Sequence, residues 1–375
     1  MSKIAVVGAG AIGCVFGARL AFFTSHEVIF CVRTPFDLVK VTLPSGQDMR
    51  VDMHPTKRKN IEEKVRNISL NEISCPVRCE TDPSKVSPGI WLNGRGIWTD
   101  KLLEEMAPGR TYSNSNYIMA VYSNDEIDQK HFYSYVKNVS LVTKELDMKI
   151  FKNIWDGIFF QSDIINKDAE YFIEYNNGYV HPSAIMENGD NIFTAKDSRI
   201  SAGAILDATS GPIIIDKNVL IDIGSLIKGP IYIGPSCIIN PGSKLRGNIT
   251  IGNDCKIGGE IEDVIFQGYS NKQHDGFLGH SYIGEWVNLG ANTNNSDLKN
   301  NYGDIRMNIG NKVIDTEKQF LGAMIGDYSR TGISTMLNTG TIIGIGANIF
   351  GEGFQNKYIP SFQWGKNGKT DLEKL

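Results

Sequence analysis

A repeat of six residues runs without slippage through the middle of the chain. Its units begin with Ile215, Ile221, Ile227, Ile233, Ile239, Leu245, Ile251 and Ile257. A second run begins its units with Ile325, Thr331, Leu337, Ile343 and Ile349, and the two runs are connected by Phe277, Ile283 and Leu289. Amphipathic helices repeat about every 3.6 residues and strands every 2, so a period of six indicates a stack of short repeats.

Each unit is long enough for one short strand and a corner, so three units close a triangular coil. Strands in successive coils then lie about 4.8 Å apart and pair in parallel, while Gly or Asp after the aliphatic residue suits the corners. We therefore predict a parallel β-helix over residues 180–365. Cys237 and Cys255 occupy the same position one coil apart, so we expect them to stack inside as small apolar side chains.

Size and charge limit the class of protein. The chain has 375 residues, 39 of them Gly, and a net charge of -4, which favours two or three globular domains. Without a basic field, nucleic acid and anionic membranes are not expected partners. The six cysteines lack zinc-like pairing, so we expect no metal site and a reducing cytoplasm. The sequence has no uninterrupted run of about 20 apolar residues, so a membrane span is not indicated.

Three glycines, Gly8, Gly10 and Gly13, follow a predicted strand at residues 3–7 and open a predicted helix. This spacing is typical of a Rossmann-like turn, where glycines let a pyrophosphate approach the helix N-terminus. Arg33 follows a second predicted strand, 27–32, and would suit the 2′-phosphate of NADP. These four residues are candidate NADP ligands; the alternative is a strand–helix–strand unit that serves only in packing.

The amino-terminal segment contains the sequence IAVVGAGAIGCVFGARLA, followed by HEV, VRTPFD and DPSKV. On these motifs, residues 1–87 resemble the amino-terminal part of ketopantoate reductases. The resemblance implies a partial Rossmann-like unit. That family continues with a catalytic lysine and a helical domain bearing an acidic residue, and neither has a counterpart after Val86. We therefore do not expect reductase activity.

Residues 88–179 mix predicted strands and helices, including LNGRGIWTDKLLEEM and WDGIFFQSDIINKDAEYF. This region is interpreted as the remnant of an α/β nucleotidyltransferase-like domain. The turn-rich YNNG at 175–178 predicts a hinge before the β-helix. The expected domains are 1–87, 88–179 and 180–365, followed by a polar tail at 366–375.

The six-residue spacing is interrupted after Glu262, and the following turns are rich in polar residues. The sequence SNKQHDGFLGHSYIGEWVNLGANT at 270–293 resembles GlmU-like sugar nucleotidyltransferases, which are related to the bifunctional UDP-N-acetylglucosamine diphosphorylase and glucosamine-1-phosphate N-acetyltransferase. The resemblance covers about residues 89–365. It implies a left-handed coil, a homotrimer with sites between subunits, and acetyl-CoA as co-substrate. Residues 294–320 contain no repeat units, so we expect an arm that reaches a neighbouring subunit.

The same resemblance implies that His274 is the catalytic base. Imidazole, whose unperturbed pKa is about 6.5, can take the proton of a sugar amine near neutral pH. The implied substrate contacts are Lys272, Phe277, Asn288, Asn301 and Tyr302. The implied acetyl-CoA contacts are Ala291 and Thr293. His280 stands where the relatives carry an acidic residue, and we expect it to be structural.

Some positions depart from that family's pattern: Phe277 replaces a tyrosine, Asn292 a glycine, Asn240 the sugar-phosphate arginine, and Glu262 a lysine. The loss of two positive charges disfavours a sugar phosphate as acceptor. Four cations could replace them in space: Lys244, Arg246, Lys272 and Lys299.

Three functions stay open at this point. The first is an acetyl-CoA-dependent N-acetyltransferase acting on an amino sugar phosphate or sugar nucleotide. The second is a sugar-1-phosphate nucleotidyltransferase, which would need Mg²⁺. That activity requires a phosphate-binding loop and acidic metal ligands, and neither is visible in the sequence before Gly89. We therefore expect this activity to be lost. The third is a non-catalytic trimeric scaffold that binds a saccharide.

Overall fold

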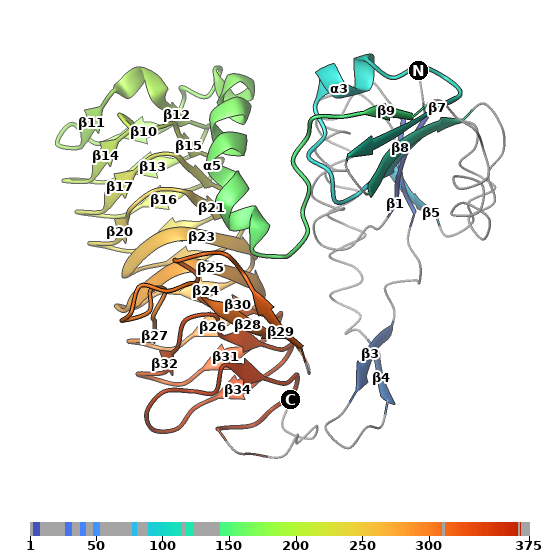
Figure 1. Cartoon of the computed structure of the whole chain (residues 1–375). Coiled ribbons are helices and arrows are strands. Elements are labelled where there is room, and N and C mark those ends of the chain that lie inside the picture. The colour runs from blue at the N-terminus through green and yellow to red at the C-terminus, as the bar shows by residue number, and fades with distance from the viewer. Residues whose placement is uncertain are drawn as a thin grey trace. The chain divides into compact units, whose positions relative to one another are not determined.

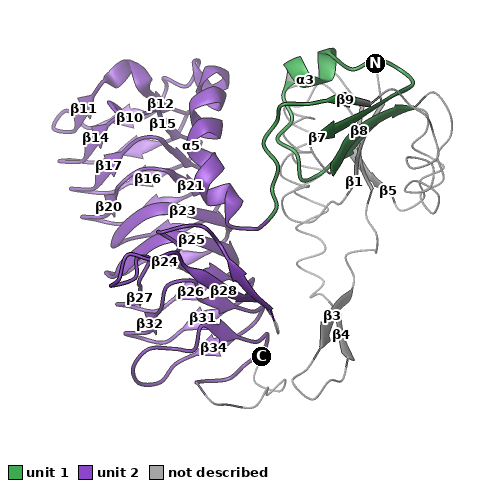
Figure 2. Cartoon of the chain, viewed as in Figure 1, with its two compact units in different colours: residues 1–152 green, residues 153–375 purple. Residues whose placement is uncertain are grey.

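The computed structural model (Figure 1) describes residues 3–7, 27–31, 38–42, 48–52, 77–80, 89–114, 117–123, 143–309, 312–366 and 368. Contacts divide the chain into two compact units, residues 1–152 and 153–375 (Figure 2). This division falls after Lys152, and the strands of unit 2 begin at Tyr179; the domains 1–87, 88–179 and 180–365 stay a prediction.

One seven-stranded sheet forms unit 1, in the order β5-β2-β1-β6-β8-β7-β9. Its strands are β1 (Lys3–Val7), β2 (Glu27–Cys31), β5 (Val77–Glu80), β6 (Gly89–Asn93), β7 (Arg110–Asn114), β8 (Tyr117–Ser123) and β9 (Thr143–Glu145). The parallel order β5-β2-β1-β6 is that of a Rossmann-like unit, as predicted. Because β1 pairs with β6, the reductase-like segment and the following segment share one sheet.

The rest of unit 1 is short elements around this sheet. The hairpin β3 (Leu38–Thr42) and β4 (Asp48–Asp52) is antiparallel. Helix α3 (Asp100–Glu104) begins after Thr99, whose hydroxyl accepts a hydrogen bond from the N–H of Leu102 at 3.4 Å. Trp91 and Tyr112 are fully buried in the described part of this unit.

Unit 2 is a parallel β-helix with three faces, which confirms the fold predicted from the repeat. Its first face has β10 (Tyr179–Val180), β13 (Arg199–Ile200), β16 (Leu220–Ile221), β19 (Ile238–Ile239), β22 (Lys256–Ile257), β24 (Asn271–Lys272), β26 (Asn288–Leu289), β31 (Arg330–Thr331) and β34 (Asn348–Ile349). Every pair along this face is parallel.

Two long strands, β23 (Glu260–Gly268) and β25 (Phe277–Glu285), run across a corner and join the second and third faces. The second face also has β11 (Ile185–Glu187), β14 (Ile205–Asp207), β17 (Leu226–Lys228) and β20 (Lys244–Leu245), and the pair β27 (Asn294–Asn295) and β32 (Met336–Leu337). The third face also has β12 (Ile192–Thr194), β15 (Ile213–Ile215), β18 (Ile231–Ile233), β21 (Ile249–Ile251), β30 (Met324–Ile325), β33 (Ile342–Ile343) and β35 (Tyr358–Ile359).

The interior of the coil is the aliphatic stack that the repeat predicts. Ile215, Ile233 and Ile251 pair in register and are 0% exposed. Each such side chain contributes roughly 1.5–3 kcal/mol by leaving water. Cys237 and Cys255 are buried free thiols, with Cys255 N only 3.4 Å from Cys237 Sγ, so the expected stacking is confirmed. The parallel pairing does not fix the hand of the coil, and left-handedness stays a prediction.

Helix α5 (Asp156–Asp168) covers the third face beside β18, β21, β23 and β25 (Figure 1). It continues into η2 (Ala169–Phe172), and a second short turn, η3 (Gly189–Asn191), follows β11. Trp155 and Ile158 pack there against the segment that follows β27. Because of this packing, α5 belongs to unit 2.

The insertion at 294–320 folds back onto its own chain. It contains the antiparallel pair β28 (Arg306–Ile309) and β29 (Lys312–Asp315). Its apolar side chains Ile305 and Met307, with Leu321 directly after it, are 0% exposed and pack with Trp155 and Ile158. The expectation of a projecting arm is therefore wrong, because projection would expose these side chains.

Candidate functional site

An open groove of about 480 Å³ lies at the corner between the first and second faces. It is lined by Asn240, Pro241, Gly258, Gly259, Gln273, His274, Asp275, Ala291 and Asn292. These residues come from successive coils. The groove therefore brings together His274 and Ala291, two of the predicted site residues, with the two departure positions Asn240 and Asn292.

The loop that carries His274 joins β24 to β25 and is held at every carbonyl. Asn240 Nδ2 donates to Gln273 O (2.9 Å), and Lys272 Nζ donates to His274 O. Asp275 O accepts from both Lys272 Nζ (3.2 Å) and Asn292 N (2.9 Å). Gly276 O accepts from Glu260 N (3.2 Å). The N–H groups of residues 274–276 have no partner among the described residues. The loop thus turns its carbonyls to the protein and leaves its N–H groups free.

The His274 side chain is exposed and lines the groove. Within the described residues its ring makes no hydrogen bond, ion pair or ring contact. A histidine in a loop could instead be hydrogen-bonded to a neighbouring carbonyl, but no carbonyl of the described residues contacts this ring. The imidazole is therefore accessible for proton transfer with a bound molecule.

Lys272 lies inside the coil and not in the groove. Its side chain is 0% exposed, and Nζ donates to the carbonyl oxygens of His274 and Asp275. Burial lowers its pKa to about 8, and the carboxylate of Asp275 opposes this shift. The ammonium form therefore predominates at pH 7, but it is not free to contact a sugar phosphate.

His280 belongs to a separate cluster on β25. Its Nδ1 lies 2.8 Å from Asp297 Oδ2, its Nε2 lies 3.6 Å from Asp263 Oδ2, and its side chain is 15% exposed. The ring also stacks on Phe320, with centroids 5.3 Å apart. Burial raises the pKa of Asp263, and the nearby His280 opposes this shift. His280 thus ties the insertion to the coil, as a structural residue would.

Replacing His280 by alanine should lower the free energy of unfolding by about 2 kcal/mol, because a partly buried hydrogen bond to a carboxylate and the stacking on Phe320 are lost. Urea unfolding would measure this. His181 is the matched control, because among the described residues its ring is hydrogen-bonded only to the exposed Ser183, with Nδ1 2.9 Å from the hydroxyl. Equal effects of the two substitutions would contradict a structural role for His280.

The remaining predicted contacts lie at different places. Thr293 is 1% exposed, and its hydroxyl bonds inside the coil to Gly290 O (2.8 Å) and Thr331 Oγ1 (2.7 Å). Phe277 directly follows the His274 loop and is half-buried. Asn288, Asn301 and Tyr302 are exposed and do not line the groove. Thr293 does not line the groove either.

No lysine or arginine of the described residues lines the His274 groove. Of the four cations considered as replacements, Arg246 pairs with Glu260 at 2.9 Å and Glu262 at 3.0 Å. Lys299 Nζ donates to the main chain of Asp304. Lys272 is enclosed and Lys244 lines a different groove, so none of the four cations lines the His274 groove.

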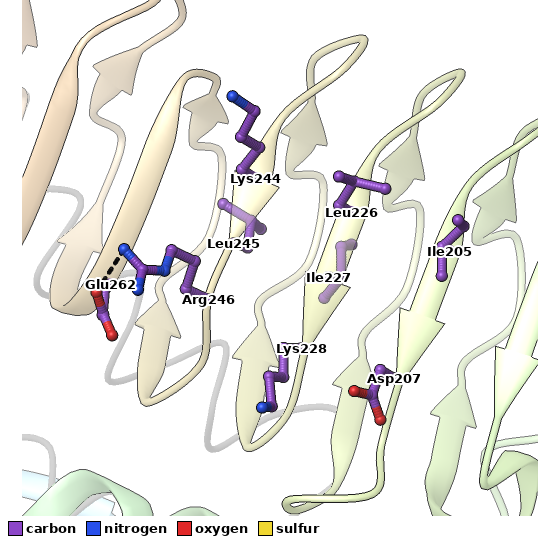
Figure 3. A pocket seen from close by; sticks show the side chains of 9 residues that line it. All are labelled: Ile205, Asp207, Leu226, Ile227, Lys228, Lys244, Leu245, Arg246 and Glu262. Atoms are coloured by element: carbon purple, nitrogen blue, oxygen red, sulfur yellow. Dashed lines mark ion pairs between the residues drawn. The ribbon is translucent and has the colours of Figure 1, made fainter.

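A second groove, of about 420 Å³, lies on the second face beside this corner (Figure 3). It is lined by Ile205, Asp207, Leu226, Ile227, Lys228, Lys244, Leu245, Arg246 and Glu262. Figure 3 shows the Arg246 side chain directed at Glu262, with Leu226 and Ile205 on neighbouring strands. In the register, Ile185, Ile205 and Leu226 form one column, and they are 55%, 37% and 43% exposed. This column is an outward-facing apolar ridge.

The four candidate NADP ligands, Gly8, Gly10, Gly13 and Arg33, lie outside the described residues. In the described part of the chain, no three His, Cys, Asp or Glu side chains are grouped so that they could hold a metal ion. None of its helices is long and apolar enough to cross a membrane.

Known proteins match parts of this chain. A family model described as Ketopantoate reductase PanE/ApbA matches residues 4–65, which confirms the resemblance of the amino-terminal segment. A bifunctional sugar-1-phosphate nucleotidylyltransferase/acetyltransferase from Sulfurisphaera tokodaii is 37% identical over 98 residues, 25% of this chain and 24% of that protein. The bifunctional protein GlmU of Methanococcus aeolicus is 34% identical over 93 residues, 24% of this chain and 22% of that protein.

The acetyltransferase domain of PglB from Neisseria gonorrhoeae FA1090 aligns over 84% of this chain and 100% of its own, at 13% identity and a TM-score of 0.19. A TM-score this low does not establish a common arrangement. The chain spans about a quarter of the length of the two bifunctional relatives. The predicted resemblance to GlmU-like proteins is thus confirmed for part of the chain.

Proposed function

We propose that the chain is an acetyl-CoA-dependent N-acetyltransferase whose acceptor is an amino sugar phosphate or a sugar nucleotide, with His274 as general base. The observation that carries this proposal is the exposed imidazole of His274, without a partner among the described residues, in an open groove at a β-helix corner. The named activities of the bifunctional relative from Sulfurisphaera tokodaii, which include acetyl transfer, support the reaction class.

In this reaction His274 takes a proton from the acceptor's ammonium group, and the freed nitrogen lone pair attacks the thioester carbonyl of acetyl-CoA. The carbonyl oxygen becomes an oxyanion until the C–S bond breaks. Coenzyme A then leaves as a thiolate and receives the proton that His274 holds. The nitrogen carries a surplus proton after the attack and releases it to solvent, so the products are a neutral amide, the thiol of coenzyme A and one proton. The free N–H groups of residues 274–276 are donors of the kind that stabilise such an oxyanion.

The charges of the side chains that line the groove favour one class of acceptor over the other. Its polar side chains are the amides of Asn240, Gln273 and Asn292 and the carboxylate of Asp275, without a cation among the described residues. Amides and a carboxylate suit sugar hydroxyls and an ammonium group better than a phosphate. A sugar nucleotide whose phosphates lie away from the amine therefore fits this groove better than a compact amino sugar phosphate.

A homotrimer would complete the site. The corner 240–243 leads directly into β20 on the second face, where Lys244 pairs with Leu226, so this near end of the apolar ridge lies one coil before the first residues of the His274 groove. A second copy packed on that ridge would place its surface beside the groove. Lys228, Lys244 and Arg246 on the same face could then meet the phosphates of acetyl-CoA or of the acceptor.

Isothermal titration of the intact oligomer with acetyl-CoA tests the co-substrate. Micromolar binding with a measurable heat is expected, because acetyl-CoA carries phosphates for the cations of the second face and a pantetheine arm for the groove. The same titration with dephospho-coenzyme A serves as control for the phosphate contribution. An oligomer that gives no heat with acetyl-CoA would remove the proposal.

Two other functions make different predictions. A sugar-1-phosphate nucleotidyltransferase would release pyrophosphate from UTP and hexosamine-1-phosphate with Mg²⁺, and we expect none. A saccharide-binding scaffold would bind sugars equally well after substitution of His274. NADP binding by Gly8, Gly10, Gly13 and Arg33 stays a separate proposal, testable by fluorescence titration with NADPH.

A further inference from the structure

We infer that Lys272 is a positioning residue, whose ammonium group holds from inside the β-helix the loop on which the His274 imidazole stands. The inference rests on the proposed function for its effect on catalysis. It differs from the substrate contact that the sequence suggested, because the Lys272 side chain is enclosed.

Lys272 interrupts an aliphatic column. Along the first face the inward residues Ile200, Ile221, Ile239 and Ile257 pair in sequence, and Lys272 is the next partner, opposite Ile257. All five side chains are 0% exposed. A buried ammonium group costs free energy unless it is hydrogen-bonded. A lysine at a position built for isoleucine therefore needs a local partner.

That partner is the main chain of the His274 loop. Lys272 Nζ donates to His274 O and, at 3.2 Å, to Asp275 O. For His274 O it is the sole donor among the described residues, whereas Asp275 O also accepts from Asn292 N. The carbonyl of the proposed base is thus fixed by Lys272 alone.

The neighbouring coil leaves room for this contact. Gly259, at φ +83°, faces the loop, and a Cβ there would lie 2.8 Å from His274 O and 3.0 Å from Lys272 Nζ. The first separation is too short for a methyl group, and the second would force the ammonium group to shift. Absence of a side chain at Gly259 therefore lets the ammonium group and the carbonyl meet.

Two apolar substitutions remove the donor: Lys272→Met keeps the length of the side chain, and Lys272→Ile restores the residue of the column. Lys272→Gln keeps N–H donors without the charge. Ile221→Met, in the same column two coils before Ile257, is the matched control for altered packing. Thermal unfolding verifies that each variant is folded, and either apolar variant that folds decides the outcome.

The apolar variants should lower kcat for acetyl transfer about 10- to 100-fold with KM for acetyl-CoA changed less than about twofold, as expected when a base is misplaced but binding is intact. Lys272→Gln should recover part of kcat, and Ile221→Met should keep it. A folded apolar variant with unchanged kcat, or with a raised KM alone, would overturn the inference.

A second measurement does not depend on activity. The ¹H–¹³C NMR signal of the His274 ring, identified by its loss in His274→Ala, should shift or broaden in the apolar variants while the His181 signal stays unchanged. An unchanged His274 signal would overturn the positioning role. If His274→Ala itself keeps full activity, the proposed function fails, and the NMR result still decides whether Lys272 holds the loop.

Discussion

His274→Ala should lower kcat for acetyl transfer about 100- to 10,000-fold, the usual contribution of a general base. The imidazole is exposed and makes no hydrogen bond to the described residues, so its removal should change the free energy of unfolding by less than about 0.5 kcal/mol. Steady-state rates with acetyl-CoA and an amino sugar nucleotide, together with urea unfolding, measure both effects.

Two other histidines of the β-helix serve as controls. His181→Ala removes a ring whose hydrogen bonds, within the part of the chain that the structure describes, go to Ser183, and it should leave kcat unchanged. His280→Ala should reduce stability and change kcat only modestly, because both ring nitrogens face aspartates. If kcat fell in the His280 variant and persisted in the His274 variant, the base would be His280 and the proposed site would be wrong.

The repeat was sufficient to predict the coil because each inward position is decided locally by one aliphatic residue. Ile215, Ile233 and Ile251 lie where the spacing places them, and Cys237 and Cys255 stack as their spacing predicts. The sheet of unit 1 was harder to predict from the sequence. Its strand β1 pairs with β6, which lies far along the chain, and no local pattern in the sequence specifies such a partner.

The candidate site was predicted only in part because the repeat loses its phase there. Lys272 follows its partner Ile257 after 15 residues, whereas Ile257 follows Ile239 after 18. Counting hexads therefore could not identify Lys272 as an inward residue. A lysine flanked by Asn271 and Gln273 is expected to be exposed, and only the register places it in the aliphatic column.

The prediction for the insertion failed for a different reason. Ile305 and Met307 are spaced two residues apart, as on one face of a strand, but Leu321 comes well after the hairpin, so no local period indicated that all three share one surface. That surface is completed by Trp155 and Ile158, which lie far earlier in the chain. Packing between distant segments also explains why α5 belongs with the β-helix and not with the preceding domain.

Leu226→Asp should dissociate the proposed homotrimer and abolish most of the proposed transfer activity. Leu226 ends the outward column of Ile185 and Ile205, and it is 43% exposed in the single chain. A carboxylate buried in an apolar contact loses its hydration, at a cost of about several kcal/mol for each copy. Light scattering should therefore show the variant at the mass of one chain, 41.5 kDa, instead of three.

Activity should fall with the mass, because Leu226 lies one coil before the first residues of the His274 groove, and the groove would lose the wall that a second copy supplies. Ile173→Asp is the matched control: Ile173 is more exposed, at 66%, but lies after η2, away from the second face. It should keep both the mass and the activity of the unchanged protein. A native chain that transfers acetyl groups as a monomer, or a Leu226→Asp variant that stays trimeric, would show that this ridge does not build the site.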